Sequence, residues 1–199
     1  MTWEPELEEL RQRQALAREM GGPDKIARQR AAGRLTVRER IGTLLDAGSF
    51  HEIGSITGNG AYDETGALQS TTPTNFLFGR GRIEGRRVVV AGDDFTVRGG
   101  ASDASIIEKQ VAAEQMAHEL RLPMIRLIEG SGGGGSVKSL EAMGYTYVPF
   151  LPGFDHMVRN LATVPVVSLG LGPIAGFGAA KVVQRHYSLL VRGQSQMFV

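Results

Sequence analysis

The chain has 199 residues, of which 42% are hydrophobic and 22% are charged. A chain of this kind is long enough to bury one sizeable core and too apolar to be disordered throughout. Its formal net charge of +1 gives no reason to expect a nucleic acid or a membrane surface as a partner. Because no cysteine is present, disulfides, thiolate metal sites and a cysteine nucleophile are excluded.

Neither the start of the chain nor its apolar runs indicate export or membrane insertion. Residues 1–6 lack the positive start and apolar core of a secretory signal, and no apolar run reaches the ~18 residues that a membrane span requires. We therefore expect a soluble, cytoplasmic protein. The 27 glycines fall between apolar runs, where an enzyme turns its backbone close to a ligand.

The first 50 residues predict three helices. Residues 4–20 form a polar helix whose thin apolar stripe predicts an arm that lies against another chain or domain. A second helix is predicted over residues 24–32. Thr36, followed three positions later by Glu39, is a capping box and predicts a third helix over residues 37–45. We expect an N-terminal helical arm over residues 1–50 and one further domain over residues 51–199.

The middle of the chain is richer in β-structure. Residues 55–75 show no clear period and predict a mobile loop or insertion. Residues 76–83 and 87–92 predict two strands of a hairpin that turns at Glu84-Gly85. Residues 102–120 predict the clearest helix, with Glu114 away from its apolar face. The residues expected on that apolar face are Ile106, Ala113, Met116, Ala117 and Leu120.

Strands and helices then alternate to the end of the chain. In order, we predict a strand over 124–128, a glycine-rich loop over 130–135, a helix over 155–162, a strand over 164–169, a second glycine-rich loop over 170–178, a helix over 178–185 and a strand over 187–191. This alternation predicts an α/β fold. In such folds ligands bind where strands give way to loops.

The first glycine-rich loop belongs to residues 129–136 and directly follows a strand of buried type. Backbone without Cβ atoms comes within contact distance of a ligand and presents several N–H donors to an oxygen. A flexible surface loop explains four consecutive glycines equally well. The residues alone favour neither interpretation.

The second glycine-rich loop stands between a strand and a helix. That position aims the N–H groups of the helix start outward, as in an oxyanion hole, where losing one donor costs ~3 kcal/mol of transition-state stabilisation. Small residues at this point also permit close packing of the helix on the strand. Both interpretations can hold at once.

Several other chemistries are disfavoured. Neither loop carries the phosphate-loop or dinucleotide pattern, so nucleotide binding is not expected. Ser131 lacks the strand-elbow context of a hydrolase, and His118, His156 and His186 have no partner that the sequence supports. We expect no metal site.

Two charged segments have two interpretations each. Asp93 and Asp94 follow a Val-rich strand and are either general bases or, more commonly, solvated loop acids. Nine cationic side chains between residues 11 and 40, among them Arg34, Arg38 and Arg40, form either a solvated helix surface or a site for the phosphates of a small ligand.

Seven segments in a fixed order carry a family resemblance. They are residues 33–41 (GRLTVRERI), 44–52 (LLDAGSFHE), 79–86 (GRGRIEGR), 94–100 (DFTVRGG), 129–133 (EGSGG), 172–176 (GPIAG) and 195–199 (SQMFV). Together they resemble the carboxyltransferase (beta) subunit of biotin-dependent acyl-CoA carboxylases of the propionyl-CoA and methylcrotonyl-CoA type. The resemblance runs from about residue 25 to the end and matches only the N-terminal part of such a subunit.

The resemblance implies a fold, a reaction and partners. The fold would be crotonase-like, an incomplete spiral of β-β-α units preceded by N-terminal helices. The reaction would move CO2 from carboxybiotin, held on a biotin carboxylase or biotin carrier subunit, to the α carbon of an acyl-CoA. The ureido group of biotin would take the α-proton, and backbone amides would stabilise the enolate oxygen. A homo-oligomer of beta subunits is also implied.

Carried over by motif, the catalytic positions are Gly176 and Phe177, where the family has an oxyanion pair that is usually Gly-Gly, with Gly178 next to them. The family's first glycine loop ends in an arginine that is missing here. The resemblance places the substrate against a larger set of residues, namely Arg34, Arg38, Arg40, Gly132, Gly133, Gly134 and Ala175. The alternative is a non-catalytic acyl-CoA-binding or assembly fragment of crotonase fold.

Overall fold

The computed structural model describes residues 2–101, 104–130, 132, 140–141, 144–145 and 153–198. Three helices begin the chain, as predicted: α1 (Glu4–Arg18), α2 (Pro23–Ala31) and α3 (Val37–Leu44). The capping box is present. The side chain of Thr36 accepts a hydrogen bond from the N–H of Glu39 at 3.3 Å, and the Glu39 carboxylate accepts one from the N–H of Thr36 at 2.8 Å.

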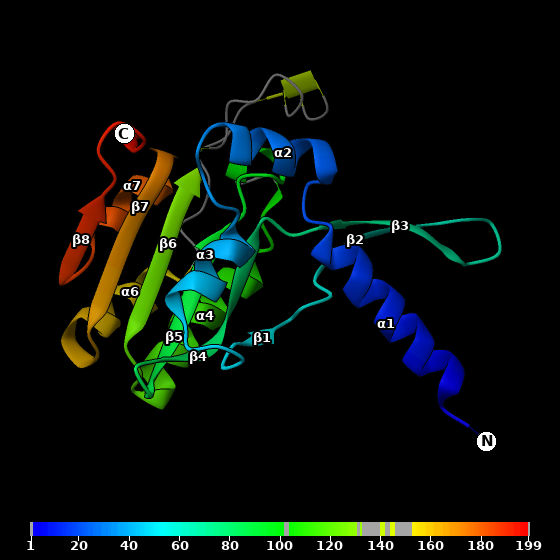
Figure 1. Ribbon diagram of the computed structural model, residues 1–199, viewed down its shortest axis with the longest axis horizontal. Helices are drawn as coiled ribbons and strands as arrows, with labels where there is room; N and C mark the ends of the chain where they lie inside the picture. Colours follow the sequence, from blue (N-terminus) through cyan, green and yellow to red (C-terminus); the bar gives the residue numbers. More distant parts are fainter. Residues whose placement is uncertain are drawn as a thin grey trace.

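A mixed sheet forms the centre of the molecule (Figure 1). It contains seven described strands, β1 (His51–Ile53), β4 (Phe76–Ile83), β5 (Arg86–Asp93), β6 (Met124–Gly130), β7 (Val166–Ala175), β8 (Tyr187–Leu190) and β9 (Gln196–Phe198). The order is β1-β4-β5-β6-β7-β8, and β9 pairs with the last residues of β7. β4 and β5 form the predicted antiparallel hairpin, whereas β5 to β8 are parallel. The carboxyl ends of the parallel strands therefore lie together at one end of the sheet.

Alternate residues of the central strands face two different cores. Phe78 and Val89 pack with Ala113 of α4 (Ile107–Leu120) on one face, where α6 (Phe154–Thr163) also lies. Val88 and Val90, one position along, pack with α3 on the other face. Because both faces are covered, these strands read as continuous apolar runs.

Helix α4 is shorter and more polar on its buried side than the sequence predicts. The helix was predicted to begin at Ser102, but it begins at Ile107. A 3-10 turn, η1 (Arg98–Gly100), precedes it. Leu120, expected on the apolar face, is 48% exposed at the helix end. Glu114, expected away from the core, is buried because it forms a two-pronged ion pair with Arg126 of β6, at 2.7 and 2.9 Å.

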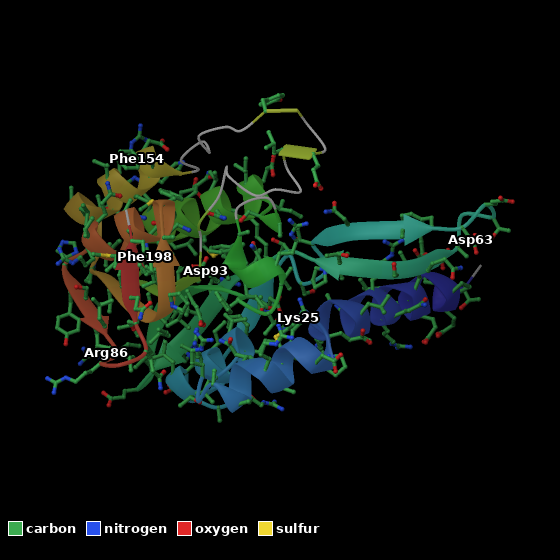
Figure 2. All side chains as sticks on the ribbon, turned by 90° about the horizontal axis from the view of Figure 1, so that it is seen from above. Lys25, Asp63, Arg86, Asp93, Phe154 and Phe198 are labelled. Atoms are coloured by element: carbon green, nitrogen blue, oxygen red, sulfur yellow. The ribbon has the colours of Figure 1, made fainter. Side chains whose placement is uncertain are left out.

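Residues 55–75 were predicted to be a mobile loop or an insertion, and the prediction of a loop was wrong. They form a separate antiparallel hairpin, β2 (Gly58–Tyr62) and β3 (Leu68–Pro73), whose tip carries Asp63. The hairpin and α1 project together from the body of the molecule (Figures 1 and 2). Arg13 of α1 donates a hydrogen bond to the Tyr62 hydroxyl at 3.0 Å, so the arm predicted for α1 lies against a hairpin of its own chain.

The second predicted glycine-rich loop is mostly strand, which corrects the prediction for residues 170–178. β7 continues through Gly170 and Gly172 to Ala175 and pairs there with β6 and β9, a strand that the sequence did not predict. Only Gly176 forms the turn into α7 (Phe177–Val183). A β-strand that contains Gly and Pro is explained by its neighbours, as described below.

Replacing Thr36 by Ala should remove half of the capping box. We expect the free energy of unfolding to fall by about 1 kcal/mol, because an N–H at the start of α3 loses its acceptor. Thr43→Ala is the control, since Thr43 lies on the exposed side of the same helix. Urea denaturation of both variants measures the difference, and equal losses would contradict the role of the cap.

Candidate functional site

The ends of β6 and β7 lie side by side, so the two predicted glycine segments meet. Gly130 is in register with Ile174, and a Cβ atom placed on Gly132 would lie 3.3 Å from the Cβ of Ala175. Gly133 and Gly134 lie outside the described residues. Where the chain is described, the structure therefore places Gly132 of the first segment beside Ala175 of the second.

Gly176 makes the turn between β7 and α7. Its backbone has φ 56° and ψ −122°, a conformation that glycine adopts without a steric penalty. Its N–H donates to the carbonyl of Phe198 in β9 at 3.2 Å, and its own carbonyl accepts from Ala179 at 3.0 Å. The amide that the sequence singled out as an oxyanion donor thus has an internal acceptor.

The next two amides belong to the start of α7. Phe177 and Gly178 are its first residues, and the first N–H groups of an α-helix have no acceptor within the helix. The turn at Gly176 is exposed, Phe177 is half-buried and Gly178 is buried. A thioester oxygen at this turn would therefore meet the N–H groups of Phe177 and Gly178.

Lys181 lies one helical turn after Phe177 in α7 and was not singled out in the sequence. It is buried, donates a hydrogen bond to the side chain of Gln110 at 3.0 Å, and lies 4.9 Å from the ring centre of Phe177 and 5.2 Å from that of Phe76. Burial lowers its pKa. The Lys181 ammonium thus contacts one ring from the sheet and one from the start of α7. A lysine among Ala and Val in a helix that packs on a sheet was the available signal.

Glu129, at the end of β6, is the most fully buried acid of the site. Its exposed fraction is 0%, and its carboxylate contacts Arg40 at 2.6 Å, Arg34 at 3.1 Å and the amide of Gln29 at 2.9 Å. Burial raises the pKa of Glu129, while the two arginines and Gln29 oppose this shift. Through these contacts, the Glu129 carboxylate connects α2 and α3 to the end of β6, next to the turn at Gly176 that follows β7.

The pocket around Glu129 explains a glycine in β7. A Cβ atom on Gly172 would lie 2.2 Å from the Glu129 carboxylate. Arg40 also donates to the carbonyl of Leu171 at 3.2 Å. Gly172 is therefore required by a side chain of the neighbouring strand β6, whereas the sequence interpretation had attributed the small residues of this segment to packing of a helix on the strand.

The three predicted arginines do not form one group. Arg34 and Arg40 converge on Glu129, whereas Arg38 pairs with Glu52 at 2.8 Å. Their guanidinium groups have carboxylate partners within the chain, which sequence reasoning did not predict. The signal that could have found this is an acid that ends a buried strand, because a buried charge requires a partner.

Arg34 still contributes to a basic hollow at the surface. The hollow has a volume of about 200 Å³, and its lining includes Lys25, Arg28, Arg34 and Phe95. The guanidinium carbon of Arg34 lies 5.2 Å from the ring centre of Phe95. Figure 2 shows Lys25 on α2 near the base of the projecting arm. The hollow combines cations with an aromatic wall.

The acids at the end of β5 are buried, although solvated loop acids are commoner. Asp93 accepts a hydrogen bond from the N–H of Glu129 at 3.3 Å. Asp94 accepts from the N–H and the hydroxyl of Thr96 at 2.9 and 2.6 Å, and burial raises its pKa. Both carboxylates hold the backbone around the strand ends.

The described part of the chain contains neither a metal-binding cluster nor a membrane-spanning helix. There, no group of three His, Asp or Glu side chains is placed to hold a metal ion. No described helix combines the length and the apolar character needed to cross a bilayer.

Comparison with known proteins identifies the family of this chain. Residues 28–199 match the carboxyl transferase domain family, and the chain belongs to that family. It is 33% identical over 194 residues to the propionyl-CoA carboxylase beta chain of Roseobacter denitrificans, covering 97% of this chain and 37% of that protein. It is 27% identical over 199 residues to the methylmalonyl-CoA decarboxylase subunit alpha of Veillonella parvula, covering 100% and 38%. The chain thus spans little more than a third of the relatives that it matches.

Solved structures show the same fold. Transcarboxylase 12S, a hexamer solved with methylmalonyl-coenzyme A and methylmalonic acid bound, superposes with a TM-score of 0.76 at 25% identity, covering 100% of this chain and 38% of that one. The geranyl-CoA carboxylase beta subunit of P. aeruginosa gives 0.68 at 30% identity, covering 88% and 33%. The predicted family and the crotonase-like α/β fold are both confirmed.

Replacing Glu129 by Ala should leave the buried guanidinium group of Arg40 and the half-buried one of Arg34 without their shared counter-charge. We expect the free energy of unfolding to fall by ~3–5 kcal/mol. Glu9→Ala is the control, because Glu9 forms an exposed pair with Arg13 and its loss should matter far less. Chemical denaturation measures both, and similar losses would show that the Glu129 contacts are not stabilising.

Lys109 predicts a dependence of stability on pH. Burial lowers the pKa of Lys109 from 10.5 to about 8 in the folded chain, with a smaller contribution from the charge of Arg38, while Glu52 opposes the shift. Between these pH values the unfolded state binds more protons than the folded state. The contribution of Lys109 to the free energy of unfolding therefore increases as pH rises from about 8 to 10.5 and decreases as pH falls toward 8. Relative to Lys109→Met, the wild type should gain up to ~3 kcal/mol between pH 8 and 10.5. Denaturation of both proteins across this range measures the gain, and a constant difference would contradict it.

Proposed function

We propose that this chain contributes the acyl-CoA-binding half of a carboxyltransferase site, in which CO2 passes from carboxybiotin to the α carbon of an acyl-CoA. The turn from β7 into α7 is the observation that carries the proposal. There the N–H groups of Phe177 and Gly178 begin a helix, beside the end of β6 and its glycines.

The amides at this turn would act on the thioester oxygen. Charge gathers on that oxygen as the α-proton leaves, and fixed N–H donors stabilise it more in the transition state than in the ground state. Gly176 supplies the turn geometry and donates its own N–H to Phe198. Its role is therefore to position the next two amides.

The hollow lined by Lys25, Arg28 and Arg34 is suited to the phosphates of CoA. Guanidinium and ammonium groups bind phosphate oxygens through charge-assisted hydrogen bonds, and the ring of Phe95 offers a flat apolar wall. This assignment keeps Arg34 from the sequence prediction. It replaces Arg38 and Arg40 by Lys25 and Arg28, because Arg38 and Arg40 point to internal carboxylates.

Carboxybiotin, when bound, supplies both the carboxyl group and the base for the α-proton, and we assign it no residue of the described chain. Its carrier would be a biotin carboxylase or biotin carrier subunit. We also propose a cytoplasmic homo-oligomer, supported by the hexamer of transcarboxylase 12S. The predicted division at residue 50 stays a proposal, because α3 shares a core with the sheet.

A second candidate is acyl-CoA binding without transfer. It is favoured by the hydrogen bond from the Gly176 N–H to Phe198, which uses internally one of the amides expected to face substrate. Titration calorimetry separates binding from its absence. We expect the wild type to give heat on binding CoA and propionyl-CoA. The affinity for both should fall at least about tenfold in a Lys25→Ala/Arg28→Ala variant. No heat at millimolar CoA would overturn both candidates.

Replacing Gly176 by Val should distinguish the two candidates. A β-branched side chain does not adopt φ 56° without strain, so the turn would re-aim the amides of Phe177 and Gly178. The probe is a CoA analogue in which a nitronate replaces the enolate. We expect the variant to bind it about 100-fold more weakly and to bind CoA as the wild type does.

Gly48→Val is the matched control, because Gly48 also has a positive φ, 71°, and lies in a loop of the N-terminal segment. Calorimetry with the nitronate should give wild-type affinity for this variant. If the wild type binds the nitronate no more tightly than CoA, the oxyanion role fails while CoA binding stands.

A further inference from the structure

The turn of the β4–β5 hairpin lies at the end of the sheet opposite the turn from β7 into α7 (Figure 1). Cationic side chains of both strands line one hollow near this hairpin turn. In the sheet register His51 lies opposite Arg80, and Arg82 lies opposite Arg87. Residues directly opposite each other, and residues two apart in one strand, share a face of a sheet. All four side chains therefore project from one face.

That face is the one that α4 covers further along the strands. Phe78 of β4 and Val89 of β5 follow the same alternation and pack against Ala113 of α4. Because α4 ends at Leu120, the part of the face next to the hairpin turn is left as a hollow of about 500 Å³. Leu120 and Leu122 form its apolar wall.

The charges in this hollow are unbalanced. None of Arg80, Arg82 and Arg87 forms an ion pair within the described chain; Arg82 only donates to the carbonyl of Gly85, at 2.9 Å. The one acid in the described lining is Glu119, which accepts a hydrogen bond from Gln115 at 2.6 Å. Like charges directly opposite on neighbouring strands destabilise a sheet. An anion bound between them would remove that repulsion.

We propose that this hollow is a second ligand site, which binds a small molecule carrying two or more phosphate charges. Guanidinium groups present paired N–H donors that match phosphate oxygens, and three of them lie with an imidazole in one concavity. A volume of about 500 Å³ lies in the range of small-molecule sites.

The concave shape favours a small ligand over an acidic protein segment, which would need a longer charged strip. The site is also distinct from the proposed acyl-CoA site. Arg87 lies near the start of β5, whereas Gly176 follows the end of β7, which runs in the same direction through β6. The two sites therefore lie at opposite ends of the parallel strands. Ligand binding at one site does not require ligand binding at the other.

The test uses inorganic pyrophosphate as the probe and titration calorimetry of the 199-residue chain. We expect saturable binding that weakens at least about tenfold in Arg82→Ala/Arg87→Ala and persists in Lys25→Ala/Arg28→Ala, which alters the other hollow proposed to bind phosphate. The matched control is Arg11→Ala/Arg18→Ala, which removes the same charge from exposed positions on α1 and should bind as the wild type does. Thermal unfolding without ligand should show Arg82→Ala/Arg87→Ala to be at least as stable as the wild type, because the opposed like charges are gone.

The following outcomes with pyrophosphate would overturn the proposal. No binding by the wild type at millimolar pyrophosphate, or equal binding by the wild type, Arg82→Ala/Arg87→Ala and Arg11→Ala/Arg18→Ala, would show that the hollow is not a site. Equal weakening by both pairs would show attraction by net charge alone. CoA is titrated as a separate arm. If Arg82→Ala/Arg87→Ala loses CoA binding as well, the hollow belongs to the CoA site and is not a second one; unchanged CoA binding supports independence.

Discussion

The buried carboxylate of Glu129 is the constraint on which the arrangement of the site depends. With an exposed fraction of 0%, it would be too costly to keep ionised without partners, and Arg34, Arg40 and Gln29 provide them. Because these partners come from α2, α3 and the turn between them, one charge holds the N-terminal helices against the ends of β6 and β7. Gly172 follows from the same contact, since only glycine leaves room for this carboxylate.

That anchoring explains how a site without a reactive side chain can exist. Main-chain amides act only if their direction is fixed before the ligand binds. Here β7 is held by β6 on one side and by β9 on the other up to Ala175, and the Gly176 amide is tied to Phe198. The turn into α7 is thereby fixed at both ends. The Gly176 N–H serves the fold, so the proposed oxyanion role falls to the amides that follow it.

The sequence predicted well whatever depends on near neighbours. The capping box of α3, the β4–β5 hairpin and the alternation of later strands and helices each follow from residues a few positions apart. The β2–β3 hairpin was missed because both of its faces are largely exposed, so its strands show no apolar alternation. Its packing partner is α1, which is distant in sequence.

Positions that depend on distant contacts were predicted poorly for the same reason. Gly170 and Gly172 look like a loop, yet they are strand residues whose Cβ space is filled by Leu190 and Glu129. The role of Arg34 and Arg40 depends on Glu129, about 90 residues further along the chain. Of the candidate site, the sequence located the glycine turns but not the partners of the arginines.

The balance of charge shows how a net value can conceal local sites. With a formal net charge of +1, the chain has no global field that would attract a polyanion. However, Glu52, Glu114 and Glu129 are each committed to arginines in the interior or at its margin. These carboxylates therefore neutralise arginines of the interior and its margin, of which only Arg34 lines either basic hollow. The hollow lined by Arg80, Arg82 and Arg87 and the hollow lined by Lys25 and Arg28 stay basic. Net charge sums over the whole chain, whereas a ligand responds to the groups within about a Debye length, ~10 Å. For a protein that pairs its acids internally, binding of anions must be judged from the placement of the remaining cations.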